Sequence, residues 1–176
     1  MDPLAAHRAR IGHIRESFAE ANERFVTRLR AADDEAVQRV PEQGGWSAAQ
    51  IAWHVASVTR RFAGLMSGER AGAQPLGADF VERPWPTIVT AIPDRLQAPS
   101  SFLPPPGVTR MDAIAALEAS GMAMARALDA VTPERGAGLG ISNPIVGGTI
   151  NLYQVGEWAT AHVIRHNKQA KQTLGR

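Results

Sequence analysis

The spacing of apolar residues along the chain predicts four amphipathic helices. Within each, apolar positions recur every three or four residues, which places them on one face of a helix that must be buried against a partner. Between the helices we find no convincing strand pattern. The sequence therefore predicts an all-α four-helix bundle. The expected helices run from Asp2 to about Ala32, from Ser47 to about Ser67, from Thr109 to Thr132 and from Asn151 to about Lys171.

Each predicted helix begins at a residue whose side chain can cap free backbone N–H groups. Asp2 is followed by Pro3, which favours the first helical position. Ser47 precedes Gln50 by three residues, a capping-box spacing that marks a strong helix start. Thr109 and Asn151 occupy the same position before the third and fourth apolar patterns. These capping residues locate the first residue of each helix more accurately than the apolar spacing does.

A long segment from Ser67 to about Val108 separates the second and third helices and holds most of the prolines. A connection of this length indicates a crossover, and such segments tend to be functional. Apolar residues such as Trp85 and Phe102 indicate that it packs across the bundle, with a short helix near residues 86–90 or 93–97. The glycine-rich stretch 136–148 matches no phosphate-binding pattern.

Composition excludes several classes of function. The 176 residues fit a single domain over 1–176, with 44% hydrophobic and 20% charged residues and a net charge of +2. The absence of cysteine excludes a thiol nucleophile, a cysteine-based zinc site and disulfides. Arginines are scattered and alternate with acids, so nucleic acid is not indicated. With no apolar leader and no run of membrane-spanning length, we expect a cytoplasmic protein without a membrane partner.

Three histidines lie on the apolar faces of the predicted helices. His162 and His166 are four residues apart on the last helix, so both rings project from one face, and His54 falls within the apolar stripe of the second helix. The peptidase pattern H-E-x-x-H is absent, since Val163 stands where its glutamate would be. His7 is expected at the end of the bundle and His13 in solvent. The alternative for the three core-facing histidines is a hydrogen-bonded polar network without a metal.

Together the three histidines predict a divalent metal site between two helices. Three neutral imidazoles supply three ligands and leave positions for water or substrate, which is the pattern of a catalytic metal site. No acid or base for proton transfer is evident beside them. Gln169 lies on the right side to hydrogen-bond a ligand or a bound water, or else is simply exposed, whereas Glu157 and Arg165 are expected to point elsewhere. We expect the 67–108 segment to cover the end of the bundle that holds the metal. Arg83 and Arg95 would then meet an anionic substrate, or alternatively remain solvated.

Three stretches resemble the DinB-like/YfiT-like superfamily of metal-binding four-helix bundles. They are Trp46-Ser47 leading to His54, Asn143-Pro144 with Gly147-Gly148 before the last helix, and Glu157-Trp158 through His162 and His166 to Gln169. The resemblance implies an antiparallel bundle with a long crossover, often a homodimer. It also implies a divalent metal held by His54, His162 and His166, commonly zinc or nickel and less often iron or manganese.

The resemblance leaves the reaction open. Some members of this superfamily resemble thiol S-transferases that use bacillithiol or mycothiol, some resemble thiol-dependent maleylpyruvate isomerases, and others are described only as metal-dependent hydrolases. It implies a metal-dependent transferase or hydrolase acting on a small molecule. Because the chain has no cysteine, any thiol must come from a low-molecular-weight cosubstrate. The alternative is a metal-binding, stress-associated bundle without catalysis.

Overall fold

All four predicted long helices are present in the computed structural model, which describes residues 2–90 and 97–175. They are α1 (Pro3–Arg30), α3 (Ala48–Ser67), α5 (Arg110–Asp129) and α7 (Leu152–Thr173). Each begins as the capping residues predict, because the side chains of Asp2, Ser47, Thr109 and Asn151 all accept a hydrogen bond from a first-turn N–H. The reciprocal capping box of Ser47 and Gln50 is complete.

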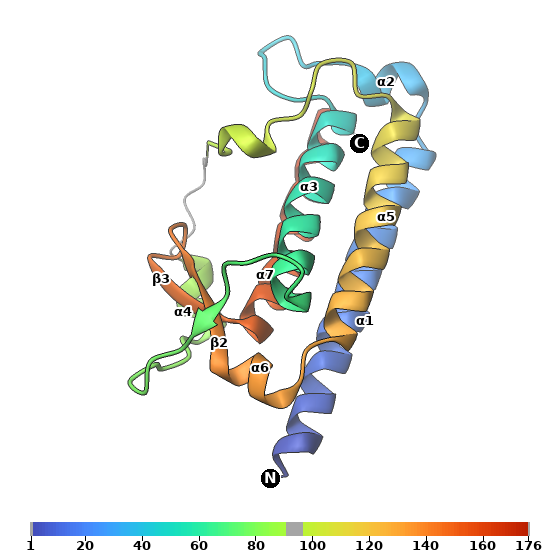
Figure 1. Cartoon of the computed structure of the whole chain (residues 1–176). Helices are drawn as coiled ribbons and strands as arrows, with labels where there is room; N and C mark the ends of the chain where they lie inside the picture. Colours follow the sequence, from blue (N-terminus) through green and yellow to red (C-terminus); the bar gives the residue numbers. More distant parts are fainter. Residues whose placement is uncertain (1, 91–96, 176) are drawn as a thin grey trace.

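The long helices pack in a ring in the order α1, α5, α3 and α7. α3 and α5 run in one direction and α1 and α7 in the other, so α3 and α7 are antiparallel neighbours (Figure 1). Consecutive helices that run in the same direction need a long return connection, and the predicted crossover between α3 and α5 supplies it. The all-α bundle with this crossover is therefore confirmed. Its core includes Ile14, Phe25, Leu29, Ile51, Leu117, Met124, Leu128 and Leu152, all fully buried.

Short elements fill the connections. They comprise α2 (Asp34–Gln38), α4 (Trp85–Thr90), the 3-10 helix η1 (Ser100–Phe102) and α6 (Pro133–Gly138). α4 is the short helix expected near 86–90, whereas most of the alternative stretch 93–97 lies outside the described residues. The apolar spacing of the third predicted helix places Met111 on its buried face, but in the first turn of α5 this side chain is 69% exposed.

A small antiparallel sheet was not expected from the sequence. It is ordered β1 (Gln74–Pro75), β2 (Leu139–Asn143) and β3 (Gly148–Asn151), with Ile141 opposite Ile150. The glycine-rich stretch before α7 forms its hairpin. In the turn, Asn143 Oδ1 accepts from Ile145 N (3.0 Å), and Gly147 takes a positive φ of 64° that disfavours other residues. The strands are too short to give a periodic signal, so the apolar pattern missed them.

Different parts of the crossover lie at opposite ends of the bundle. Its first half lies beside the sheet, near the end of α3, and its last part passes over the beginning of α3 (Figure 1). There Gln50 Nε2 donates to the Pro105 carbonyl (3.4 Å). Within the described ranges, no helix combines the length and the apolar character needed to cross a membrane.

Candidate metal centre

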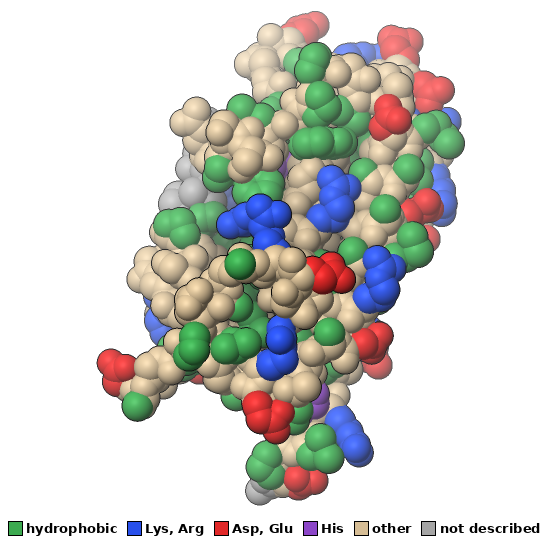
Figure 2. All heavy atoms as spheres, viewed as in Figure 1, with side chains coloured by type: hydrophobic (Ala, Val, Ile, Leu, Met, Phe, Trp, Pro, Cys, Tyr) green, Lys and Arg blue, Asp and Glu red, His purple; other side chains and the backbone are tan. Residues whose placement is uncertain are grey.

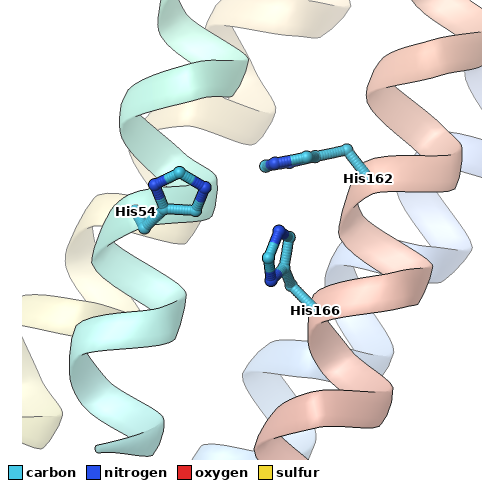
Figure 3. Close-up of side chains that lie close together, drawn as sticks. All are labelled: His54, His162 and His166. Atoms are coloured by element: carbon cyan, nitrogen blue, oxygen red, sulfur yellow. The ribbon is translucent and has the colours of Figure 1, made fainter. Parts of the chain in front are cut away.

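His54, His162 and His166 lie together between two antiparallel helices. His54 projects from the first half of α3, His162 from the middle of α7, and His166 from one turn further along α7 (Figure 3). One ring nitrogen from each lies within 4.8 Å of those of the other two. The ring centroids are 5.2 Å apart for His54 and His162, 5.1 Å for His54 and His166, and 4.4 Å for His162 and His166. The expected convergence of the three side chains is therefore present.

A main-chain carbonyl orients His54. Its Nδ1 lies 2.9 Å from the carbonyl oxygen of Phe102, in η1. Because a carbonyl only accepts, Nδ1 must carry the proton, and the lone pair of the neutral ring is then on Nε2. The crossover thus sets the tautomer of His54. A backbone acceptor leaves no mark in the sequence, so Phe102 was anticipated only as an apolar contact.

Gln169 orients His166 in the same way. The side-chain oxygen Oε1 of Gln169 lies 2.8 Å from His166 Nδ1, three residues earlier on α7. An Nδ1–H that donates to this oxygen again leaves the lone pair of the neutral ring on Nε2. Of the two expectations for Gln169, the hydrogen bond to one of these histidines is present, and Gln169 is also exposed, as the other expectation had it. Outer partners of this kind fix the ring orientation of metal-binding histidines.

His162 differs from the other two in having a buried nitrogen without a partner. No group in the described part of the chain hydrogen-bonds its Nδ1, although the atom is shielded from water. A buried polar atom in this state costs free energy unless another group satisfies it. The unsatisfied atom lies in the same cluster that brings three ring nitrogens together, which fits a site built to hold a further group.

All three imidazoles favour the neutral form. Burial is the largest cause and lowers the pKa of each below the ordinary value of 6.5. Burial brings the pKa of His166 to about 4, although its hydrogen bond to Gln169 opposes the shift. The pKa of His162 falls well below the ordinary value, and the charges of His166, His54 and Arg165 contribute to that shift. Neutral imidazole is the form that binds metals.

Aromatic side chains surround His54. The ring centroid of Trp46 lies 5.0 Å from that of His54, and the Phe102 ring stands edge-on to His54 at 6.5 Å. Trp46 directly precedes the N-cap Ser47, so the capping box that begins α3 also holds this indole beside the histidine. The crossover therefore does cover the histidine end of the bundle, through Phe102 and Pro105.

The other sequence candidates lie elsewhere. Arg83 Nη1 donates to the Val146 carbonyl (2.8 Å), and its guanidinium lines a cavity of about 550 Å³ between the sheet and residues 74–83. The expectation that Arg83 meets a substrate at the histidines is therefore wrong, because the first half of the crossover packs on the sheet. Arg95 lies outside the described residues.

Glu157 is off the histidine cluster, as expected, and binds Arg10 and Trp85. His13 is exposed, and His7 Nδ1 lies 2.8 Å from the Tyr153 hydroxyl.

The donor set suits a borderline divalent metal ion. Three neutral imidazoles on rigid helices are suitable ligands for zinc or nickel, and two of them have their Nδ1–H already satisfied. No aspartate or glutamate belongs to this cluster among the residues that the structure describes. Three protein ligands leave coordination positions for water or a small molecule, as catalytic sites require.

Comparison with known proteins identifies the family. Neither curated proteins nor solved structures give a match to this chain. The family model of the DinB superfamily matches residues 17–170, a range that includes the second half of α1, all of α3 and α5, most of α7 and the three histidines. The match covers most of the chain and agrees with the observed bundle. The chain therefore belongs to the DinB superfamily.

Proposed function

We propose that His54, His162 and His166 bind one divalent metal ion, zinc or nickel, and that the chain uses it to transform a small molecule. The observation that carries this proposal is the convergence of three neutral ring nitrogens within 4.8 Å of one another. Helices hold these side chains in place before any ion arrives, so little conformational entropy is lost on binding. A buried and unsatisfied His162 Nδ1 adds a reason for the cluster to take up a further group.

An ion held there supplies Lewis-acid chemistry, which activates either a water for hydrolysis or a low-molecular-weight thiol for transfer. The residues nearby favour the thiol. Water attack is usually assisted by a positioned general base such as a carboxylate. Among the described residues, no aspartate or glutamate joins the three histidines in their cluster. A thiol gives up its proton more readily than water, so it depends less on such a base.

In this proposal the chain's own residues position the metal ligands and shield the site, and they do not themselves react with the substrate. The Phe102 carbonyl and Gln169 hold two imidazoles with their Nε2 lone pairs available. Trp46 and Phe102 exclude water around His54. With no cysteine in the sequence, the thiol must be a cosubstrate. We therefore propose a thiol-dependent transferase in which the protein supplies the metal site and its walls.

Metal uptake tests the first part of this proposal. Purified protein should carry or take up about one zinc or nickel ion per chain, and His54→Ala, His162→Ala and His166→Ala should each reduce affinity at least about a hundredfold. The measurements are elemental analysis and titration of the chelator-treated protein. His13→Ala and His7→Ala are the controls and should retain full uptake. Full occupancy in any of the three site variants would show that the ligands are assigned wrongly.

A substrate screen tests the second part. Metal-loaded protein is incubated with electrophilic small molecules and with hydrolysable esters and amides, each with and without added low-molecular-weight thiols. Thiol transfer predicts turnover that depends on the thiol and disappears in His162→Ala. Thiol-independent turnover of an ester or amide would instead favour hydrolysis.

A further inference from the structure

The candidate metal centre has no negative charge among its donors. Three neutral imidazoles leave the two positive charges of a divalent ion uncompensated, and no carboxylate joins the cluster within the described ranges. In a partly buried site, such an excess of positive charge favours an anionic ligand over a neutral one.

A second cation, Arg61, lies close to the same centre. It follows His54 by seven residues on α3, so it projects from the same side of the helix about two turns further on. Its guanidinium carbon lies 6.0 Å from the centre of the Phe102 ring, and that ring lies 6.5 Å from His54. Phe102 thus connects the two side chains along one surface.

Arg61 is exposed, and none of the ion pairs in the described part of the chain includes it. Its neighbour Arg60 instead donates to the Ser57 hydroxyl (3.3 Å). The space-filling view shows several side chains of the Lys and Arg colour class on the face of the molecule that carries α3 and α5 (Figure 2). A guanidinium that rests on an aromatic face keeps its N–H groups available for a carboxylate.

We propose that the small molecule acting at the three histidines is an anion whose carboxylate binds Arg61. This inference rests on the proposed function and specifies its substrate class. Two helical turns separate His54 from Arg61, so the carboxylate and the reactive group should be roughly 10 Å apart or less. The hydrocarbon between them would lie along Phe102. The ligand class is therefore a carboxylate-bearing thiol or electrophile of a few carbons, and a neutral molecule of the same size should bind more weakly.

Two probes of equal length test this inference, 6-mercaptohexanoate and 6-mercaptohexan-1-ol. Each is titrated into cobalt-loaded protein at fixed pH and low salt, and binding is followed by the visible and near-ultraviolet absorption of the cobalt. On binding, the thiol releases its proton to the buffer. The wild-type protein should bind the carboxylate at least about fivefold more tightly than the alcohol. Arg61→Gln should bring the two affinities within about twofold without changing the affinity for the alcohol.

Arg60→Gln is the matched control, because it removes the same charge from the adjacent residue on α3 and should keep the preference. Equal affinities of the two probes in the wild-type protein, or an unchanged preference in Arg61→Gln, would overturn the inference while cobalt binding stands. A protein that takes up no cobalt would instead overturn the metal site itself, so the two failures are distinguishable. Raising the salt concentration should reduce the preference, since Arg61 is exposed.

Discussion

At the scale of single residues, the histidines depend on the oxygen atoms that orient them. The Phe102 carbonyl and Gln169 Oε1 each accept one Nδ1–H, which selects the tautomer that has Nε2 free. The Phe102 acceptor is part of the backbone, whereas Gln169 Oε1 belongs to a side chain. A substitution can therefore remove the Gln169 acceptor without moving the backbone. Gln169 therefore offers the cleanest test of how much orientation contributes to the site.

Gln169→Ala should weaken zinc affinity by about tenfold, because His166 would lose the partner that fixes its ring and tautomer. The affinity is measured by competition with a chromophoric chelator. Gln169→Glu keeps an acceptor oxygen and should restore most of the affinity. Gln172→Ala, an exposed glutamine one turn further on, should have no effect. If Gln169→Ala binds zinc as tightly as the wild type, the hydrogen bond does not contribute to the site.

At the scale of elements, a polar cluster holds the first half of the crossover on the bundle. Arg10 of α1 donates to Glu157 of α7 (2.8 Å) and to Glu82 of the crossover (2.7 Å), and Trp85 Nε1 of α4 donates to Glu157 (2.7 Å). Burial opposes the charge of Arg10, but the hydrogen bonds to both carboxylates outweigh it and raise the arginine pKa. Trp85 also stacks on Trp158, with ring centroids 6.4 Å apart. These contacts join three elements far apart in the sequence.

Glu157→Gln should lower the free energy of unfolding by about 1–3 kcal/mol, because Arg10 would lose one of its two charged partners in a half-buried setting. Denaturant unfolding measures the loss. Metal uptake should remain unchanged, since Glu157 binds α1 and α4 rather than the histidines. Glu20→Gln is the control, since its pairing with Arg24 is exposed and should contribute less than about 1 kcal/mol. A loss as small as that of the control would show that the cluster does not stabilise the fold.

At the scale of the whole molecule, the three histidines of the candidate metal centre couple stability to pH. In the unfolded chain an imidazole titrates near 6.5, whereas in the folded protein the pKa of His166 is about 4. Between these values the unfolded state binds a proton that the folded state does not. The stability of the metal-free protein should therefore fall as the pH drops from about 6.5 to about 4, and His54 and His162 act in the same direction.

For His166 alone the expected loss is roughly 3 kcal/mol across this range. It is measured as the free energy of unfolding at several pH values in the presence of a chelator. His166→Ala should show a weaker dependence on pH, and His13→Ala, which alters an exposed ring, should keep the wild-type dependence. A wild-type stability that stays constant from pH 7 to about 4.5 would contradict the lowered pKa values.

The bundle was predictable from the sequence because its determinants are local. Apolar residues spaced for a helix and the capping side chains of Ser47 and Asn151 act within one or two turns, so the four helices can be recognised without knowing their partners. The histidine spacing is also local on α7. That His54 faces the same space follows once α3 and α7 are antiparallel neighbours.

Tertiary structure alone decided what surrounds those histidines. The carbonyl that orients His54 belongs to the backbone of a segment 48 residues away, and a backbone acceptor carries no residue type. Nothing in the sequence distinguishes Arg61 from Arg83 as a residue near the histidines. In the structure Arg83 packs on the sheet, whereas Arg61 of α3 lies beside Phe102, next to the histidines. The strand β1 pairs with β2, more than sixty residues further along the chain, and Arg83 donates to Val146 in the turn between β2 and β3. Helical periodicity determined which residues face the core, and long-range packing determined which of them meet at the site.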